Sequence, residues 1–321
     1  MKQPLPYRDF GTWIAEHFPY KVQKLPIDAG LTCPNRDGRL GWNGCIFCNN
    51  EAFNPLYNKK NLSLSEQIAA GKNFFARKYP QMHFIAYLQA YTNTYSSIPR
   101  LKDIYETVLK EDGIEGISIA TRPDCVDEEL LDFLQELSRH TFVIVEYGIE
   151  TTNDKTLSFI NRGHDFSCAQ RMVELTAKRG IYTCGHVILG LPGEDKEENL
   201  RQADIISAMP LTILKIHQLQ VIRNTTLEKL YEQAPFPLYT VEEYIELLAD
   251  YIQRLRSDLV LERFVSQTPK HLLVAPHWGI KPQEFNERLV EYMQNNQIWQ
   301  GKKACDINIS CSVTNKESPA W

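Results

Sequence analysis

Short strand-like runs alternate with helix-length amphipathic segments from residue 24 to residue 220, and this alternation restricts the possible folds more than any other feature of the sequence. Strands are expected at residues 24–29, 82–88, 116–120, 142–149, 182–189 and 212–219. Helices are expected at residues 65–78, 98–110, 127–139, 167–179 and 196–208, each beginning near Ser, Pro or Asp. This order of elements is typical of βα units arranged around a parallel sheet.

The number of units indicates an incomplete barrel. A barrel of eight units typically takes about 250 residues, whereas about 200 are available here. We therefore predict an α/β fold, a partial (β/α)6 TIM-like barrel, over residues 1–235, where Pro235 and Pro237 mark the end of the pattern. A mainly helical C-terminal extension that closes the barrel is expected at 236–300, and a polar tail at 301–321.

Composition excludes several classes of protein. The 321 residues are 43% hydrophobic and carry a net charge of −5, which excludes disordered and fibrous chains. A chain of this length buries enough surface to be stable without disulfides. No run approaches the roughly 18 apolar residues of a membrane span, and the first residues lack a secretory signal, so we expect a cytoplasmic protein with no membrane contact. The acidic balance argues against nucleic-acid binding by bulk charge.

Three of the eight cysteines, Cys33, Cys45 and Cys48, lie in one glycine-containing loop after the first expected strand, with the spacing C-x11-C-x2-C. Three thiolates can hold three irons of a four-iron cluster and leave the fourth iron open for a chelating small molecule. A zinc site completed by His17 or His83, and three unligated cysteines, are the alternatives. The other cysteines show no ligand spacing: Cys125, Cys168, Cys184, Cys305 and Cys311.

The cysteine loop at the end of the first strand of a partial βα barrel resembles the radical S-adenosylmethionine (SAM) superfamily. Most members have C-x3-C-x2-C, and the longer first gap here resembles the branch that contains the catalytic subunit of Elongator. The string around Cys33 is similar to the bacterial YhcC/YtqA-like (MnmL-like) proteins, and the resemblance covers about residues 5–300. It implies a [4Fe-4S] cluster on Cys33, Cys45 and Cys48, SAM as cofactor, and an electron donor such as flavodoxin or ferredoxin.

The resemblance also implies residues that bind SAM. Thr92 matches the stretch that receives the SAM amino group, although Ala90 and Tyr91 replace glycines of the family. Glu150 matches the position that binds the ribose hydroxyls. Arg162, in the string N-R-G-H, matches the position that holds the SAM carboxylate, and a surface salt bridge is the alternative for it.

Four further side chains are candidates. Glu146 lies four residues before Glu150 on the same strand, so both carboxylates are expected on one face, with Glu146 inside the barrel towards the SAM amino group or the substrate. In the fifth strand, Ile188 is expected against the adenine, and His186 falls where the coproporphyrinogen oxidase has a ribose-binding aspartate. Gln220 follows the sixth strand as a candidate contact at the barrel mouth.

Two residues have alternatives that the sequence leaves open. Arg122 follows the third strand in the string T-R-P-D, which is similar to the Elongator subunit's E-T-R-P-D, with Ala120 in place of the glutamate. It is either a cation of the site or a solvated strand-end residue. Trp278, in the C-terminal extension, either reaches the site or packs in the core.

The implied activity is that of a radical SAM enzyme that modifies tRNA, taking the wobble-uridine side chain from carboxymethylaminomethyluridine towards aminomethyluridine. Trp42, Phe47 and Phe53 near the cysteines could stack a splayed base or pack around the loop. A radical SAM enzyme acting on a small metabolite, and a zinc-stabilised RNA-binding protein without catalysis, are the alternative functions. No residue is singled out as the group that handles substrate protons.

Overall fold

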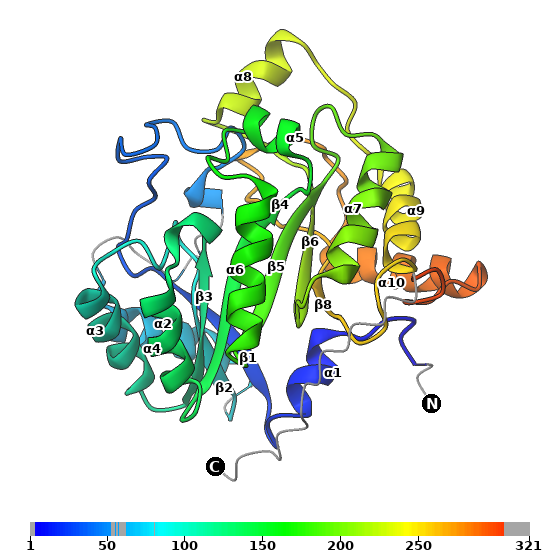
Figure 1. Ribbon diagram of the computed structural model, residues 1–321. Helices are drawn as coiled ribbons and strands as arrows, with labels where there is room; N and C mark the ends of the chain where they lie inside the picture. Colours follow the sequence, from blue (N-terminus) through cyan, green and yellow to red (C-terminus); the bar gives the residue numbers. More distant parts are fainter. Residues whose placement is uncertain (1–3, 53–54, 56, 58–61, 80, 305–321) are drawn as a thin grey trace.

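A seven-stranded, entirely parallel sheet forms the centre of the molecule, in the order β1-β2-β3-β4-β5-β6-β8. The computed structural model describes residues 4–52, 55, 57, 62–79 and 81–304. The strands are β1 (Val22–Ile27), β2 (His83–Leu88), β3 (Ile114–Thr121), β4 (Phe142–Glu150), β5 (Tyr182–Leu189), β6 (Ile213–Gln218) and β8 (Val260–Arg263). The sheet curls into an incomplete barrel with its helices outside, as Figure 1 shows.

The helices that connect the strands cover the outer face of the sheet. They are α2 (Leu64–Ala76), α3 (Ile98–Leu109), α4 (Glu128–Leu137), the short α5 (Asp154–Phe159), α6 (Phe166–Lys178) and α7 (Lys196–Ala208). Two 3-10 turns, at Asn50–Ala52 and Pro123–Cys125, lie in the loops after β1 and β3. Outward-facing strand residues such as Leu25, Ile117, Val145 and Val187 pack against these helices in the main core. The partial α/β barrel predicted from the sequence is confirmed.

The sheet has one strand more than the six expected. β8 pairs in parallel with β6, with Ile213 opposite Val260 and Leu214 opposite Leu261. Its four residues, V-L-E-R, are too short and too charged to predict a strand from their pattern. The prediction of a mainly helical extension was therefore incomplete, because part of the extension completes the sheet.

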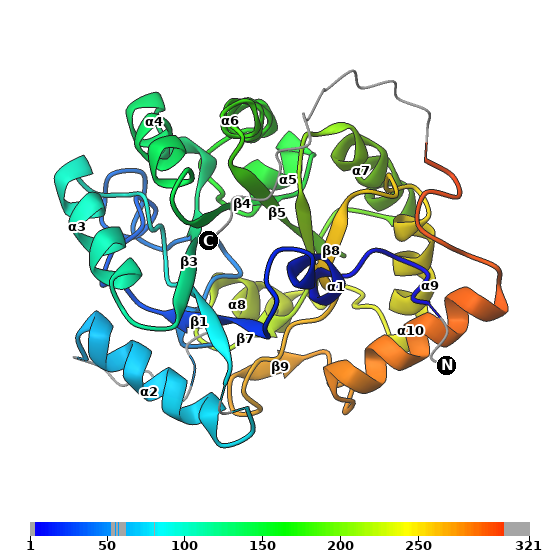
Figure 2. The same cartoon turned by 90° about the horizontal axis from the view of Figure 1, so that it is seen from below.

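The lower end of the barrel is closed by α1 (Phe10–Ala15), which the sequence did not predict. Figure 2 shows this helix beneath the amino ends of the strands. The Trp13 ring contacts the rings of Phe142 (5.8 Å between centroids) and Tyr182 (5.3 Å), and Ile14 is buried beside them. The site is therefore built at the opposite, carboxyl end of the strands, where the loops carry polar side chains.

The two edges of the sheet, β1 and β8, face each other without a ladder of backbone hydrogen bonds between them. Lys24 on β1 donates to Glu262 on β8 at 2.6 Å, and an isolated bridge joins Asp9 to Leu261. Side chains and the segment around α1 thus close the seam of the barrel.

The C-terminal extension covers part of the upper end and then continues down the side of the barrel beside α7 (Figure 1). Strand β7 (Val221–Ile222) pairs antiparallel with β9 (Leu273–Ala275), and the helices are α8 (Thr226–Gln233), α9 (Val241–Ile252) and α10 (Pro282–Asn295). Trp278 packs between Tyr244 and Phe285, and its Nε1 donates to the carbonyl of Tyr239 at 3.0 Å. Of the two interpretations of Trp278, core packing is correct.

Among the residues that the structure describes, no helix is both long and apolar enough to span a membrane. The predicted tail from residue 305 onwards, with Cys305 and Cys311, lies outside the described residues, as does Phe53.

Candidate active site

The cysteine loop is held against the connection between α5 and α6 by reciprocal hydrogen bonds. Asn35 Nδ2 donates to the carbonyl of Asn161 at 2.7 Å, and Asn161 Nδ2 donates back to the carbonyl of Gly44 at 2.8 Å. The amide of Ile46 donates to the carbonyl of Ile160 at 3.0 Å. Gly44 has φ +72°, which only glycine adopts without strain. These contacts bring the predicted N-R-G-H string directly to the cysteines.

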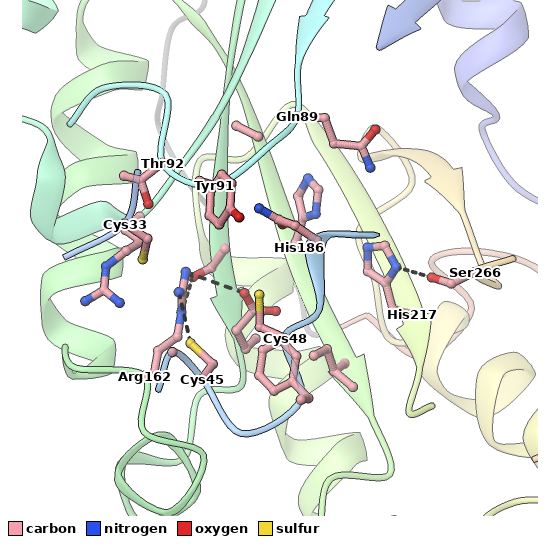
Figure 3. Close-up of a pocket in the computed structure, with 18 of the residues that line it drawn as sticks. Cys33, Cys45, Cys48, Gln89, Tyr91, Thr92, Arg162, His186, His217 and Ser266 are labelled. Carbon is pink, nitrogen blue, oxygen red and sulfur yellow. Dashed lines mark hydrogen bonds and ion pairs between the residues drawn. The ribbon is translucent and has the colours of Figure 1, made fainter. Parts of the chain in front are cut away.

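Cys33, Cys45 and Cys48 line one pocket at the carboxyl ends of the strands, seen in Figure 3. All are free thiols, and burial, with the neighbouring Cys45, raises the pKa of the Cys48 thiol to about 11. The histidines proposed for a zinc site lie elsewhere: His17 contacts Trp13 edge to face at the lower end, and His83 pairs with Glu115. Neither histidine lines the pocket.

All the remaining predicted site residues line this same pocket. They are Thr92, Glu146, Glu150, Arg162, His186, Ile188 and Gln220. They come from two strands, β4 and β5, and from three loops, so the fold brings together residues that are up to 187 positions apart in the chain, from Cys33 to Gln220. Their individual roles stay predictions.

Arg162 is a buried side chain between the cysteines and β4. Its Nη2 donates to the carbonyl of Gly148 at 2.6 Å, its Nη1 lies 3.7 Å from Cys45 Sγ, and Glu150 Oε1 is 3.5 Å from Nη2. A Cβ at position 148 would overlap both Arg162 and Glu150, so the glycine makes room for this pair. Because Arg162 is 6% exposed, the surface salt bridge considered for it is excluded.

Several buried polar atoms that line the pocket have no hydrogen-bond partner among the described residues. They are Asn50 Nδ2, Thr92 Oγ1, Arg122 Nη1 and His217 Nε2. Arg122 is buried and its other nitrogens pair with Asp124 at 2.8 and 2.9 Å, so it is not a solvated strand-end residue. Buried polar groups in proteins are nearly always satisfied, and these atoms therefore fit a polar ligand in the pocket.

Glu146 forms the floor of the pocket at the centre of the barrel. Its two oxygens accept from Lys24 at 2.7 Å, from Lys215 at 2.6 Å and from His186 Nε2 at 2.7 Å, and the Ser118 hydroxyl also donates to it. Burial opposes its ionisation, but Lys215 and Lys24 outweigh burial and hold the pKa of Glu146 well below its usual value. The carboxylate stays charged within the protein interior.

Glu262 completes this cluster from β8. It pairs with Lys24 at 2.6 Å and with Lys215 at 3.2 Å, so two lysines and two glutamates alternate around the floor. Glu146, His186 and Cys184 could in geometry hold a metal ion. The lysines already occupy both carboxylate oxygens, so the three cysteines are the better metal site.

The sixth strand fixes the C-terminal extension against the pocket. His217 Nδ1 is 2.8 Å from the Ser266 hydroxyl, and Ser266 NH donates to Gln218 Oε1 at 2.7 Å. Gln220 accepts from Thr268 at 2.7 Å and donates to the carbonyl of Ser266 at 3.3 Å. Gln220 thus lines the pocket and anchors this segment at the same time.

The sequence matches the family model of the radical SAM superfamily over residues 37–202, and that of the radical SAM C-terminal domain over residues 211–295. The chain belongs to the radical SAM superfamily. It is therefore an enzyme whose cofactors are a [4Fe-4S] cluster and SAM. Membership of this superfamily favours a four-iron cluster as the group that the three cysteines bind, over a zinc ion or no metal at all.

Relatives locate the chain within the radical SAM superfamily. It is 33% identical to YtqA of Bacillus subtilis over 92% of both chains. It is 26% identical to the tRNA uridine(34) acetyltransferase of Methanocaldococcus jannaschii over 63% of this chain and 37% of that protein. The structure of Elp3 from Methanocaldococcus infernus has the same fold, with a TM-score of 0.67, 17% identity, and coverage of 87% of this chain and 64% of that one. The chain lies in the radical SAM branch related to Elongator complex protein 3.

Among the residues that line this pocket, sequence reasoning missed Tyr87, Arg263 and Ser266. Tyr87 stands in an apolar run and reads as core, and the other two lie in a segment without periodicity. Lys24 was the available signal of a buried polar cluster in the barrel, because a charged residue inside an apolar strand needs a buried partner.

Proposed function

We propose that this radical SAM enzyme modifies the wobble uridine of tRNA, taking a carboxymethylaminomethyl side chain towards the aminomethyl form. The observation that carries the proposal is the shared sequence with the tRNA uridine(34) acetyltransferase, which covers 63% of this chain. That relative acts on uridine 34 of tRNA, the wobble position.

The surface beside the pocket supports an RNA substrate. Of the large apolar side chains that the structure exposes, Leu40 (54%), Trp42 (74%) and Tyr91 (40%) lie in or next to the cysteine loop. Arg39 lies over the Tyr95 ring, with its guanidinium 5.5 Å from the ring centroid. Exposed aromatic rings and arginines are the side chains on which unstacked RNA bases stack.

We assign the cofactor contacts to the residues that the pocket brings together. Cys33, Cys45 and Cys48 hold the cluster, and Arg162, beside Cys45, binds the SAM carboxylate. When bound, the reduced cluster supplies the electron that cleaves SAM into methionine and a 5′-deoxyadenosyl radical. Around it, the protein orients and shields the reactants.

The other predicted residues complete this binding site. Thr92 Oγ1, which lacks a partner among the described side chains, accepts from the SAM amino group, and Glu150 binds the ribose. Ile188 packs against the adenine. His186 lies beneath, bonded to Glu146, and Gln220 holds the C-terminal wall in place.

We place the enzyme in the cytoplasm, where a flavodoxin or ferredoxin would supply the electron. None of the six cysteines that the structure describes forms a disulfide, in keeping with a reducing compartment.

The test is an anaerobic assay of the reconstituted protein with tRNA that carries carboxymethylaminomethyluridine. We expect aminomethyluridine to appear in the digested tRNA and 5′-deoxyadenosine to form faster with this tRNA than without it. The control is tRNA that already carries aminomethyluridine. Equal 5′-deoxyadenosine formation with and without tRNA, and an unchanged nucleoside, would contradict the proposal and favour a small-metabolite substrate.

A further inference from the structure

Arg263, the last residue of β8, differs from the other arginines that line the pocket. Arg36 donates to the carbonyl of Cys48 at 2.6 Å, Arg122 pairs with Asp124 at 2.8 Å, and Arg162 binds Gly148 and Glu150. Arg263 forms no ion pair and no side-chain hydrogen bond with any residue in the described part of the chain. Its guanidinium has five donors, and the half-buried residue lines the pocket.

No carboxylate of the ion cluster on the pocket floor is left over to balance the positive charge of Arg263. Lys24 and Lys215 are matched by Glu146 and Glu262, so the ion cluster itself is neutral. The two histidines beside it add no charge, because burial lowers the pKa of both His186 and His217. Arg263 therefore gives the floor one net positive charge, which an anionic ligand would balance.

Neutral hydrogen-bond donors surround the same position. His217 Nδ1 is bonded to Ser266, and its Nε2 is buried without a partner among the described residues. When the Ser266 hydroxyl donates to Nδ1, Nε2 carries the proton and can donate into the pocket. Tyr87 lines the pocket as well, and burial raises the pKa of its phenol well above the usual value, so it remains a donor.

The position is separate from the cysteines. Figure 3 shows His217 and Ser266 across the pocket from Cys33, Cys45 and Arg162. Arg263 stands beside His217 on the neighbouring strand, because Lys215 is its partner in the β6–β8 register. Two of the four arginines that line the pocket thus lie on opposite sides of it, Arg162 next to the cysteines and Arg263 at the far wall.

We propose that Arg263, with His217 and Tyr87, binds a carboxylate on the substrate side chain and so selects carboxymethylaminomethyluridine. The assignment rests on the proposed function, since it identifies the part of that substrate which the pocket recognises. Arg263 is a specificity determinant: it favours the substrate over the aminomethyl product, which has lost the carboxylate.

The experiment compares two anticodon stem-loop RNAs, one with carboxymethylaminomethyluridine and one with its methyl ester, which lacks the negative charge and is larger by one methyl group. Arg263→Gln is expected to lower kcat/KM for the carboxylate RNA about 10- to 100-fold, the effect of losing a charge-assisted hydrogen bond, and to change the ester by less than about threefold. Arg263→Lys should restore part of the preference. The matched control is Arg288→Gln on the exposed face of α10.

Iron content and SAM affinity are measured on each variant and should match the wild type. Tyr87→Phe removes a single hydroxyl and should lower the carboxylate-over-ester preference about tenfold, which keeps the proposal testable if Arg263→Gln does not fold. An unchanged preference in Arg263→Gln or Tyr87→Phe, or an equal loss for both RNAs, would overturn the assignment. Wild-type protein that converts neither RNA would instead overturn the proposed function, and the inference with it.

Discussion

Glu146 is the residue at which a single change should disturb the protein interior most. It is 0% exposed and accepts hydrogen bonds from Lys24, Lys215, His186 and Ser118. Glu146→Gln keeps the shape of the side chain and removes its charge. Two buried ammonium groups would then share one carboxylate, Glu262, and one positive charge would be left uncompensated.

The size of the effect follows from this imbalance. Removing one partner of a buried ion pair costs about 3–5 kcal/mol. Unfolding entropy of about 2.1 cal/mol/K per residue gives about 0.7 kcal/mol/K for a chain of this length, so the midpoint of thermal unfolding should fall by about 4–7 °C. The pKa of Glu146 lies well below its usual value, so the carboxylate's contribution is complete above the ordinary glutamate pKa and is lost only at lower pH. The difference from wild type should therefore be constant between pH 5.5 and 8.

The assay is thermal unfolding of the anaerobic, cluster-loaded protein at one fixed scan rate, because the measured midpoint depends on that rate. The double variant Glu146→Gln/Lys215→Met, which restores the balance of charge, should recover at least half of the lost stability. A decrease below about 1.5 °C in Glu146→Gln, or a double variant as unstable as the single one, would refute the reasoning that Glu146 is a charged centre of the cluster.

Three other predictions concern the cofactor site and its surroundings. Cys48→Ala should abolish both the cluster and SAM cleavage, measured by iron and sulfide analysis and 5′-deoxyadenosine formation; a normal iron content in a variant lacking all three loop cysteines would disprove the ligand assignment. Arg162→Ala and Glu150→Ala should keep the iron and raise the Kd for SAM at least about tenfold by loss of charge-assisted hydrogen bonds, and unchanged affinity in both would remove the SAM assignment. Burial lowers the pKa of His217, so unfolding takes up a proton at this residue, and its contribution to stability should fall below about pH 6.5 by up to about 1.4 kcal/mol per pH unit. His217→Gln should reduce the pH slope of stability in urea titrations by this one contribution, and an equal slope would count against a neutral His217.

The sequence was sufficient for the features that local patterns determine. Each of the first six strands was predicted within a few residues of its observed ends, because apolar runs between amphipathic helices leave few alternatives. The cysteine loop and the strand-end residues converged on one pocket for a topological reason: in a parallel barrel all carboxyl ends of the strands meet at one rim. A correct prediction of the carboxyl ends of the six strands was therefore enough to predict that their residues share one pocket.

The features that were missed depend on contacts between distant parts of the chain. Lys24 and Glu262 are 238 residues apart, and neither carries a local sign that the other is its partner. Arg263 became a candidate only when its strand was placed beside Lys215. Tyr87 lies in an apolar run and would be predicted as a core residue, and only the structure shows that charged groups surround its ring. The charge balance of the floor is a property of the assembled barrel, not of any segment.

The seam between β1 and β8 has a consequence for how the width of the barrel is set. Adjacent strands in a ladder are fixed at about 4.8 Å by their backbone hydrogen bonds, so a closed barrel can change its diameter only by changing its strand number or stagger. Here the last gap is spanned by the Lys24 and Glu262 side chains, whose reach depends on their length, and by the segment before α1, which is bonded to Leu261. We therefore expect Glu262→Asp, which shortens one of these side chains, to change the width of the bore at the seam without altering the register of any strand.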